Sequence, residues 1–145
     1  MCGIIGFVGT KPAAPIVLQG LRNLEYRGYD SAGMASIKDS KLHLRKDVGK
    51  VEEVNQKHKL DELPGNTAIG HTRWATHGGV SQQNAHPHVD CTNKIAVAHN
   101  GIIENYQELR QMLKAEGHIF SSETDTEIIP HLIEDCLKEG SSLEK

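Results

Sequence analysis

The sequence lacks blocks of like charge and long apolar runs, and these absences exclude several classes of protein. Lysine and arginine total 16 against 19 acidic residues, a balance that predicts neither a nucleic-acid surface nor an anionic membrane surface. The apolar segment 1–9 is too short to span a bilayer and has no basic start, so it is neither a membrane span nor a signal peptide. We therefore expect no membrane partner and no nucleic-acid partner.

Cysteine is also scarce. Cys2, Cys91 and Cys136 form an odd set at wide spacings, and nothing in the sequence directs the chain to an oxidising compartment. We expect reduced thiols in a cytoplasmic protein. With 145 residues and 37% hydrophobic content, the chain can bury one core, which predicts one domain or most of one.

Hydrophobic periodicity predicts a mixture of strands and helices. Two segments are too rich in glycine and polar residues for regular structure, namely 26–33 and 73–93. A long irregular loop in a small domain is usually functional, which draws attention to the second of them. The expected strands are 4–8, 34–37, 42–45, 67–72 and 94–99, and the expected helices are 12–25, 51–60, 104–116 and one running from about 124 to 137.

The last of these helices carries conflicting signals. Thr124 and Glu127 match a capping pattern that would start it, with Asp125 in the first turn. Pro130 would then remove a backbone hydrogen bond six positions into the helix. The helix therefore begins late or is kinked at Pro130.

Cys2 is a candidate nucleophile if Met1 is removed. Its thiol would then share one residue with a free α-amino group, and the two kinds of group titrate within roughly one pH unit of each other. The amine could therefore act as the base for the thiol without a histidine. A single cysteine in apolar surroundings is more often structural, so Cys2 alone does not decide the matter.

Polar residues that follow two of the expected strands could complete such a site. Asn100 and Gly101 could offer a side-chain amide and a backbone N–H as an oxyanion hole, although Asn-Gly is also a common turn. Arg73 could bind a carboxylate through its two-pronged guanidinium, and Asp125 could pair with an ammonium group. Arginine beside Trp74 could equally be surface packing, and Asp125 could simply favour a helix start.

The nine histidines raise the question of a metal. His86, His88 and Cys91 could bind zinc, because His-x-His on a strand turns both rings to one face. No spacing in the sequence completes a fourfold set around them, so we expect no metal and no cofactor.

Six blocks, taken together and in order, resemble the N-terminal-nucleophile (class II) glutamine amidotransferases, and most closely the glutaminase domain of the glucosamine-6-phosphate synthase family. These blocks are 2–6, 24–33, 71–78, 84–88, 99–105 and 122–127.

The resemblance implies a fold and an extent. The expected fold is α+β, a four-layer α/β/β/α sandwich of two mainly antiparallel sheets, incomplete in this chain. Residues 1–145 would form the glutaminase domain, shortened at its C-terminal end, with the sugar isomerase domains absent. Missing strands would leave sheet edges unpaired.

The resemblance also implies an activity, in which L-glutamine is hydrolysed to glutamate and ammonia through a Cys2 thioester. In the full-length enzyme, a homo-oligomer of amino sugar metabolism, the ammonia converts fructose 6-phosphate to glucosamine 6-phosphate. The implied roles are the nucleophile for Cys2, the oxyanion hole for Asn100 and Gly101, the carboxylate clamp for Arg73, the ammonium partner for Asp125, the loop over glutamine for Thr76 and His77, a place near that loop for His86, and the ammonia gate for Trp74.

Two alternatives stay open. Another N-terminal-cysteine amidotransferase, such as asparagine synthetase or amidophosphoribosyltransferase, would use the same chemistry, although the blocks at 26–33 and 71–78 favour the hexosamine enzyme. A histidine-rich metal-binding module without catalysis belongs to a different class, and it predicts bound zinc in the purified protein.

Overall fold

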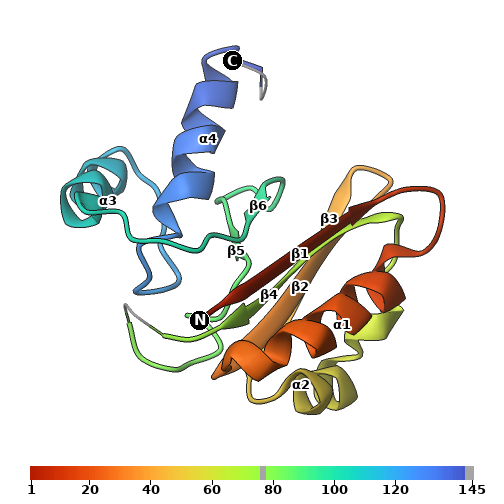
Figure 1. The fold of residues 1–145 in the computed structure, drawn as a ribbon. Helices are drawn as coiled ribbons and strands as arrows, with labels where there is room; N and C mark the ends of the chain where they lie inside the picture. The colour runs from red at the N-terminus through yellow and green to blue at the C-terminus, as the bar shows by residue number, and fades with distance from the viewer. Residues whose placement is uncertain (76–77, 143–145) are drawn as a thin grey trace.

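The computed structural model describes residues 1–75 and 78–142 of the chain. Helices α1 and α2 cover one face of a four-stranded antiparallel sheet, and a small hairpin with helices α3 and α4 lies on the other side (Figure 1). This is an α+β fold with the layers in the expected α/β/β/α order, although the second sheet has only two strands in the described residues. None of the helices in the described part combines the length and apolar character needed to cross a membrane.

The large sheet has the strand order β1-β4-β2-β3. Strand β4 (Thr67–Arg73) therefore lies between β1 (Gly3–Val8) and β2 (Ser31–Lys38), and β3 (Lys41–Val48) forms an edge. Antiparallel pairing places Gly3 beside Thr72, so the start of the chain lies beside the end of β4.

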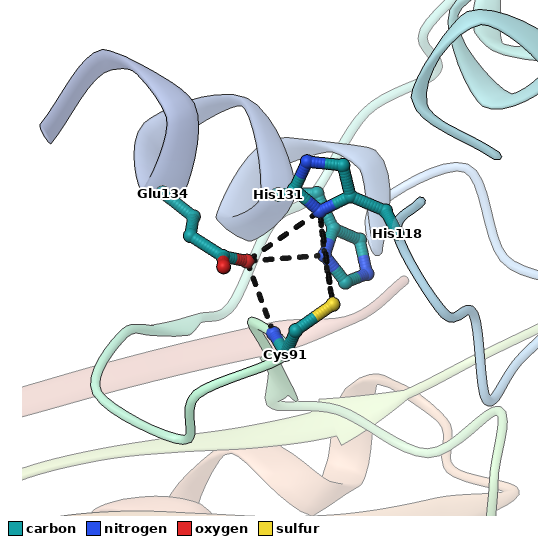
Figure 2. Close-up of side chains that lie close together, drawn as sticks. All are labelled: Cys91, His118, His131 and Glu134. Carbon is teal, nitrogen blue, oxygen red and sulfur yellow. Dashed lines mark hydrogen bonds and ion pairs between the residues drawn. The ribbon is translucent and has the colours of Figure 1, made fainter. Parts of the chain in front are cut away.

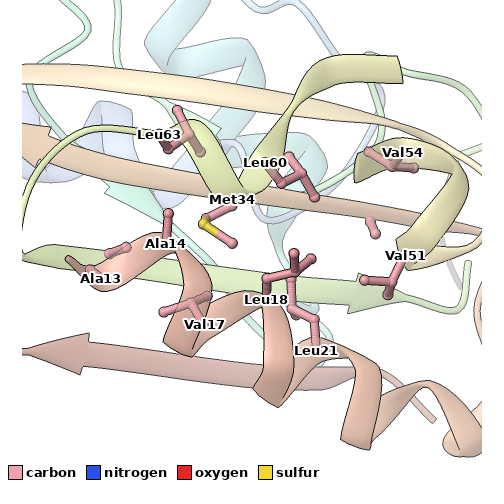
Figure 3. Close-up of a cluster of buried hydrophobic side chains, with 12 residues drawn as sticks. Ala13, Ala14, Val17, Leu18, Leu21, Met34, Val51, Val54, Leu60 and Leu63 are labelled. Atoms are coloured by element: carbon pink, nitrogen blue, oxygen red, sulfur yellow. The ribbon is translucent and has the colours of Figure 1, made fainter. Parts of the chain in front are cut away.

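The hydrophobic core lies between the large sheet and its two helices (Figure 3). Helix α1 (Ala13–Leu24) buries Val17, Leu18 and Leu21 at helical spacing, and α2 (Val51–His58) adds Val51 and Val54. The sheet contributes alternate residues of its central strands, since successive side chains of a strand point to opposite faces. These sheet residues are Ala32, Met34 and Ala68.

The opposite face of the sheet is covered most closely at the end where β4 finishes. A Cβ atom on Gly33 would lie 2.2 Å from the carbonyl oxygen of His86, so only glycine allows this approach. At the other end of the same face, Val8 is 79% exposed and Ile37 44%. The second layer therefore packs against the large sheet mainly near the C-terminal end of β4.

One strand on this second side is shorter than expected. The strand expected at 94–99 is reduced to β6 (Ala96–Val97), which pairs with β5 (His88–Val89). The carboxylate of Asp90 accepts the backbone N–H groups of Lys94 and Ile95 at 2.8 and 2.7 Å. These donors are therefore taken by a side chain instead of by a neighbouring strand.

The expected loop 26–33 is also shorter, because β2 begins at Ser31 and pairs on both sides. Helix α3 (Tyr106–Ala115) lies within its expected range. Helix α4 (Ile128–Lys138) begins late, which places Pro130 in its first turn, where a missing N–H costs nothing. The expected position of Asp125 in that turn is therefore wrong, and Asp125 precedes the helix.

Candidate active site

A cavity of about 520 Å³ lies where the start of β1, the end of β4 and two loops of the second layer meet. It brings together seven of the nine residues singled out in the sequence. The other two, Thr76 and His77, lie outside the described residues. The seven in the cavity lining are Cys2, Arg73, Trp74, His86, Asn100, Gly101 and Asp125.

Cys2 lies at the edge of this cavity against the chain that leaves β4. The backbone N–H of Trp74 donates to Cys2 Sγ over 3.1 Å, and Sγ lies 3.4 Å from the Trp74 carbonyl oxygen. Met1 also lines the cavity, and its ammonium group donates to the Arg27 carbonyl oxygen at 2.6 Å. With Met1 present, the nitrogen of Cys2 is part of a peptide bond.

A chain of contacts orients the amide of Asn100. Its Nδ2 donates to the carbonyl oxygen of Cys2 at 3.3 Å, while its Oδ1 lies 2.8 Å from His71 Nε2. His71 stacks on His86 with ring centroids 4.2 Å apart. A donor is required opposite Asn100 Oδ1, so His71 carries its proton on Nε2 and thereby directs Nδ2 towards Cys2.

Burial keeps these histidines neutral. It lowers the pKa of His71 to about 4, and the nearby Arg73 contributes to the same shift. Burial also lowers the pKa of His86, with further contributions from His71 and His88. His71 is completely buried and His86 nearly so. Both rings therefore act at neutral pH as uncharged packing and hydrogen-bonding groups.

Gly101, directly after Asn100, has φ at 153°, a backbone conformation that side chains disfavour. A Cβ at this position would also lie 2.8 Å from His99 Nε2. His99 Nδ1 in turn lies 3.3 Å from Thr126 Oγ1, which connects the 99–101 segment to the residues before α4. The sharp bend that carries Asn100 into the cavity thus requires glycine.

The guanidinium of Arg73 is almost completely buried at the end of β4. It donates to the carbonyl oxygens of Gly79 and Gly78 at 3.1 and 3.4 Å and lies 3.9 Å from Asp30 Oδ1. Asp30 also accepts the backbone N–H of Ala75. Arg73 is therefore a fixed, partly neutralised positive charge in the cavity wall.

Asp125 is also buried, and its Oδ2 accepts the backbone N–H of Ile103 at 2.8 Å. This bond holds the end of the segment that carries Asn100. Asp125 therefore has a structural role, and its charge also faces the cavity that it lines. These two roles can be separated experimentally, because asparagine keeps an acceptor oxygen and loses the charge.

Trp74 forms an exposed part of the rim, with 53% of its surface accessible. Its ring packs on Gly28, where a Cβ would lie 2.9 Å from the ring and where φ is 106°. Glycine in the 26–33 segment is therefore needed for the position of this ring.

The metal candidate of the sequence is not assembled. His86 and His88 contact each other, and His88 Nε2 lies 2.8 Å from Thr124 Oγ1. Cys91 lies instead beside His118 and His131. His86, His88 and Cys91 therefore do not share one centre.

The sequence assigned no role in the site to three residues that the structure connects to it. Asp30 lies beside Arg73, His71 orients Asn100, and Glu127 accepts the N–H groups of Ser121 and Ser122 at 2.7 Å each, next to the 124–126 wall. All three lie within the six blocks that resemble the amidotransferases, and this was the one indication in the sequence that they belong to the site. Asp30 and His71 contact partners 29 to 45 positions away in the sequence, and Glu127 accepts hydrogen bonds from residues that precede it in the chain. No local sequence pattern encodes these contacts.

Residues 55–142 match the family model described as a glutamine amidotransferase domain. The chain is similar to two enzymes named glutamine–fructose-6-phosphate aminotransferase (isomerizing). The relative from Methanococcus maripaludis is 58% identical over 96% of this chain, and the one from Pyrococcus horikoshii is 56% identical over 95%. The chain spans only 23% of the length of each.

Two solved structures are similar to the fold. The glutamine phosphoribosylpyrophosphate amidotransferase of B. subtilis, in complex with ADP and GMP, aligns with a TM-score of 0.76. A structure described as the allosteric regulatory enzyme of purine biosynthesis aligns with a TM-score of 0.78. Each is 36% identical, and each alignment covers 90% of this chain and 29% of the other.

The buried histidines predict that acid destabilises the fold. His71 has a pKa of about 4 when folded and about 6.5 when unfolded, so the unfolded state binds more protons between these values and stability falls as the pH is lowered through 6.5. For His71 alone the loss at pH 5 is on the order of 2 kcal/mol. Urea unfolding at pH 7.5 and pH 5 measures it. A His71→Gln variant should lose correspondingly less between the two pH values, and an unchanged difference would contradict the assignment.

Proposed function

The chain belongs to the glutamine amidotransferase domain family, and from that premise we propose that it hydrolyses L-glutamine with Cys2 as the nucleophile. The observation that carries the proposal is the single cavity that gathers Cys2 with an oriented amide, a buried guanidinium and a buried carboxylate. Removal of Met1 is part of the proposal. It would free the amine of Cys2 and vacate the space that Met1 takes in the cavity lining.

The reaction has two steps. The thiolate of Cys2 attacks the side-chain amide carbon of glutamine, and collapse of the tetrahedral intermediate breaks the carbon–nitrogen bond. The ammonium group of Cys2 supplies the proton with which ammonia leaves, and a γ-glutamyl thioester remains. Water then hydrolyses the thioester, which gives glutamate and restores the thiol.

Asn100 and Gly101 stabilise the oxyanion of both steps through Nδ2 and a backbone N–H. The position of Asn100 Nδ2 beside Cys2, held there by His71, supports this role. Because the hydrogen bond between His71 and Asn100 already fixes the amide, Asn100 needs to move little when negative charge develops on the substrate oxygen.

Two buried side chains of opposite charge would bind the α-carboxylate and α-ammonium groups of glutamine. Arg73 binds the α-carboxylate and Asp125 the α-ammonium group, and the family resemblance assigns Thr76 and His77, which lie outside the described residues, to the loop over glutamine. The ring of His86 stacks on the ring of His71 and so helps to hold it in place. The burial of both charged side chains in one cavity wall favours recognition of a zwitterion.

Ammonia would then serve a second reaction in a longer enzyme. The relatives at 56 to 58% identity favour conversion of fructose 6-phosphate to glucosamine 6-phosphate over the purine pathway, whose solved enzymes are 36% identical. Trp74, half exposed on the rim, would gate the ammonia. The domain would act in a cytoplasmic homo-oligomer together with sugar isomerase domains that these 145 residues do not include.

Cys2→Ala should abolish the release of glutamate and ammonia from glutamine, because no other thiol lines the cavity among the described residues. The matched control is Cys136→Ala on the exposed side of α4, which should keep the parent rate. Intact-mass spectrometry of the same samples should show that Met1 is absent. Hydrolysis that survives Cys2→Ala, or that is found in a chain retaining Met1, would refute this mechanism.

Asn100→Ala should lower the turnover of glutamine by ~100-fold or more and change its KM little, since the lost donor acts on the developing oxyanion. Steady-state kinetics over a range of glutamine concentrations separates the two parameters. If KM rose while turnover stayed constant, the segment 100–101 would be a binding turn without a role in the chemistry.

Arg73→Lys should weaken glutamine binding by about 1 to 3 kcal/mol, because lysine keeps the charge and loses the bidentate fork. Asp125→Asn should weaken it similarly while keeping an acceptor for Ile103. The sharper measurement uses glutamine analogues without the α-amino group or with an α-carboxamide. Asp125→Asn should discriminate much less than the parent against the first, and Arg73→Lys against the second. Equal hydrolysis of glutamine and both analogues by the parent would rule out head-group recognition.

A further inference from the structure

Four side chains outside the cavity converge on one point between the β5–β6 hairpin and α4 (Figure 2). Cys91 lies in the hairpin turn, His118 follows α3, and His131 and Glu134 lie one turn apart on α4. Cys91 is exposed, whereas the other three are at most 8% exposed. A thiol, two imidazoles and a carboxylate are all metal ligands.

Five of the six distances between the facing atoms are close to the edges of a metal-centred tetrahedron, and the sixth, from Cys91 Sγ to Glu134 Oε2, is within 4.8 Å. Zinc bonds of ~2.3 Å to sulfur and ~2.0 to 2.1 Å to nitrogen or oxygen imply edges of about 3.6 Å from sulfur to nitrogen and about 3.3 Å between the lighter atoms. Cys91 Sγ lies 3.7 and 3.6 Å from the Nδ1 atoms of His118 and His131. The two Nδ1 atoms are 3.2 Å apart. Glu134 Oε2 lies 3.5 and 3.7 Å from them.

The far side of each ring faces a carboxylate. His118 Nε2 lies 2.9 Å from both oxygens of Asp135, and His131 Nε2 lies 3.8 Å from Glu127 Oε1. His131 is completely buried, and its Nε2 has no hydrogen-bond partner among the described residues. Metal-bound histidines commonly donate their second N–H to a carboxylate, and the contact of His118 with Asp135 has this form.

This arrangement leaves lone pairs facing one another. If the Nε2 atoms carry the protons, both Nδ1 atoms are bare acceptors that point at each other, at the carboxylate of Glu134 and at the sulfur of Cys91. In this tautomer the thiol proton of Cys91 is the one side-chain proton between these four atoms, and Glu134 Oε2 also accepts the backbone N–H of Cys91 at 3.2 Å. A single shared proton could join two of the four atoms, whereas a metal ion satisfies all of them.

We propose that Cys91, His118, His131 and Glu134 bind one zinc ion. The thiolate and imidazoles select zinc over magnesium or calcium, which prefer oxygen ligands. Four protein ligands leave no open position, so the site is structural and not catalytic. Binding would release the thiol proton of Cys91 to solvent and would join three segments that are separate in the sequence.

The proposed ion would support the wall of the active site, and this part rests on the proposed function. Glu127 lies beside His131 and accepts hydrogen bonds from Ser121 and Ser122. The segment between Ser122 and Glu127 carries Thr124, Asp125 and Thr126 of the cavity. Zinc fixes the start of α4 and hence the carboxylate that we assign to the ammonium group of glutamine.

The test is the metal content of the chain, purified without a polyhistidine tag and without chelators. The parent should hold close to one zinc per chain by elemental analysis. Cys91→Ser, a small change at an exposed position, should weaken zinc binding at least ~10-fold, whereas Cys136→Ser should not. Glu116→Gln is a second control, because Glu116, His118 and Asp135 form a rival group of three on the other side of the His118 ring.

Cobalt reconstitution keeps the proposal testable if Cys91→Ser folds poorly. Cobalt bound to the parent should show the absorption bands of a thiolate ligand in tetrahedral geometry. A chelator should lower the unfolding temperature of the parent and leave that of Cys91→Ser unchanged. Metal-free parent protein that gives no thiolate–cobalt band, or zinc lost in Glu116→Gln and retained in Cys91→Ser, would overturn the site.

These readouts do not depend on catalysis. If a chain that lacks Met1 binds zinc but does not hydrolyse glutamine, this site stands and the proposed function is refuted. If it hydrolyses glutamine but binds no zinc, the proposed function stands and this site is refuted. If both hold, Cys91→Ser should raise the KM for glutamine more than it lowers turnover.

Discussion

The antiparallel pairing of β1 with β4 is the constraint on which the site depends. Because Gly3 lies opposite Thr72, the second residue of the chain lies beside the first residues after β4. The backbone N–H of Trp74 then donates to the sulfur of Cys2. A shift of one residue would turn every side chain of β1 to the other face and remove Cys2 from the cavity. The hydrophobic core favours this register, because Ile5 and Phe7 of β1 pack against it.

Most of the helices and strands could be predicted because their signals are local, whereas the four-layer arrangement was implied by the family resemblance. The helices and the long strands follow from hydrophobic period and from glycine and proline at their ends. The predicted strand and helix boundaries were wrong where tertiary contacts outweigh the local preference of the sequence. Asp90 accepts donors that would otherwise extend β6, and β2 begins early because strands pair on both of its sides. Glu127 turns back to Ser121 and Ser122 in place of a capping box.

The candidate site was predicted mainly through resemblance, since no single residue carried it. Cys2, Arg73, Asn100 and Asp125 each had an ordinary structural explanation in the sequence, and the structure adds their common cavity. The supporting residues could not be found in this way, because their roles exist only in contact. His71 is one histidine among nine until its Nε2 is placed 2.8 Å from Asn100. The convergence of Cys91 with His118, His131 and Glu134 is equally invisible along the chain.

The position of Met1 has a practical consequence for work with this protein. Its ammonium group is held by the Arg27 carbonyl, and the residue forms part of the cavity lining beside Cys2. Any residue left ahead of Cys2 by a cleaved affinity tag would take the same place and would keep the nitrogen of Cys2 in a peptide bond. Under the proposed mechanism, recombinant protein needs its fusion partner at the C-terminus, and an inactive preparation with residues left ahead of Cys2 does not test whether the sequence is competent.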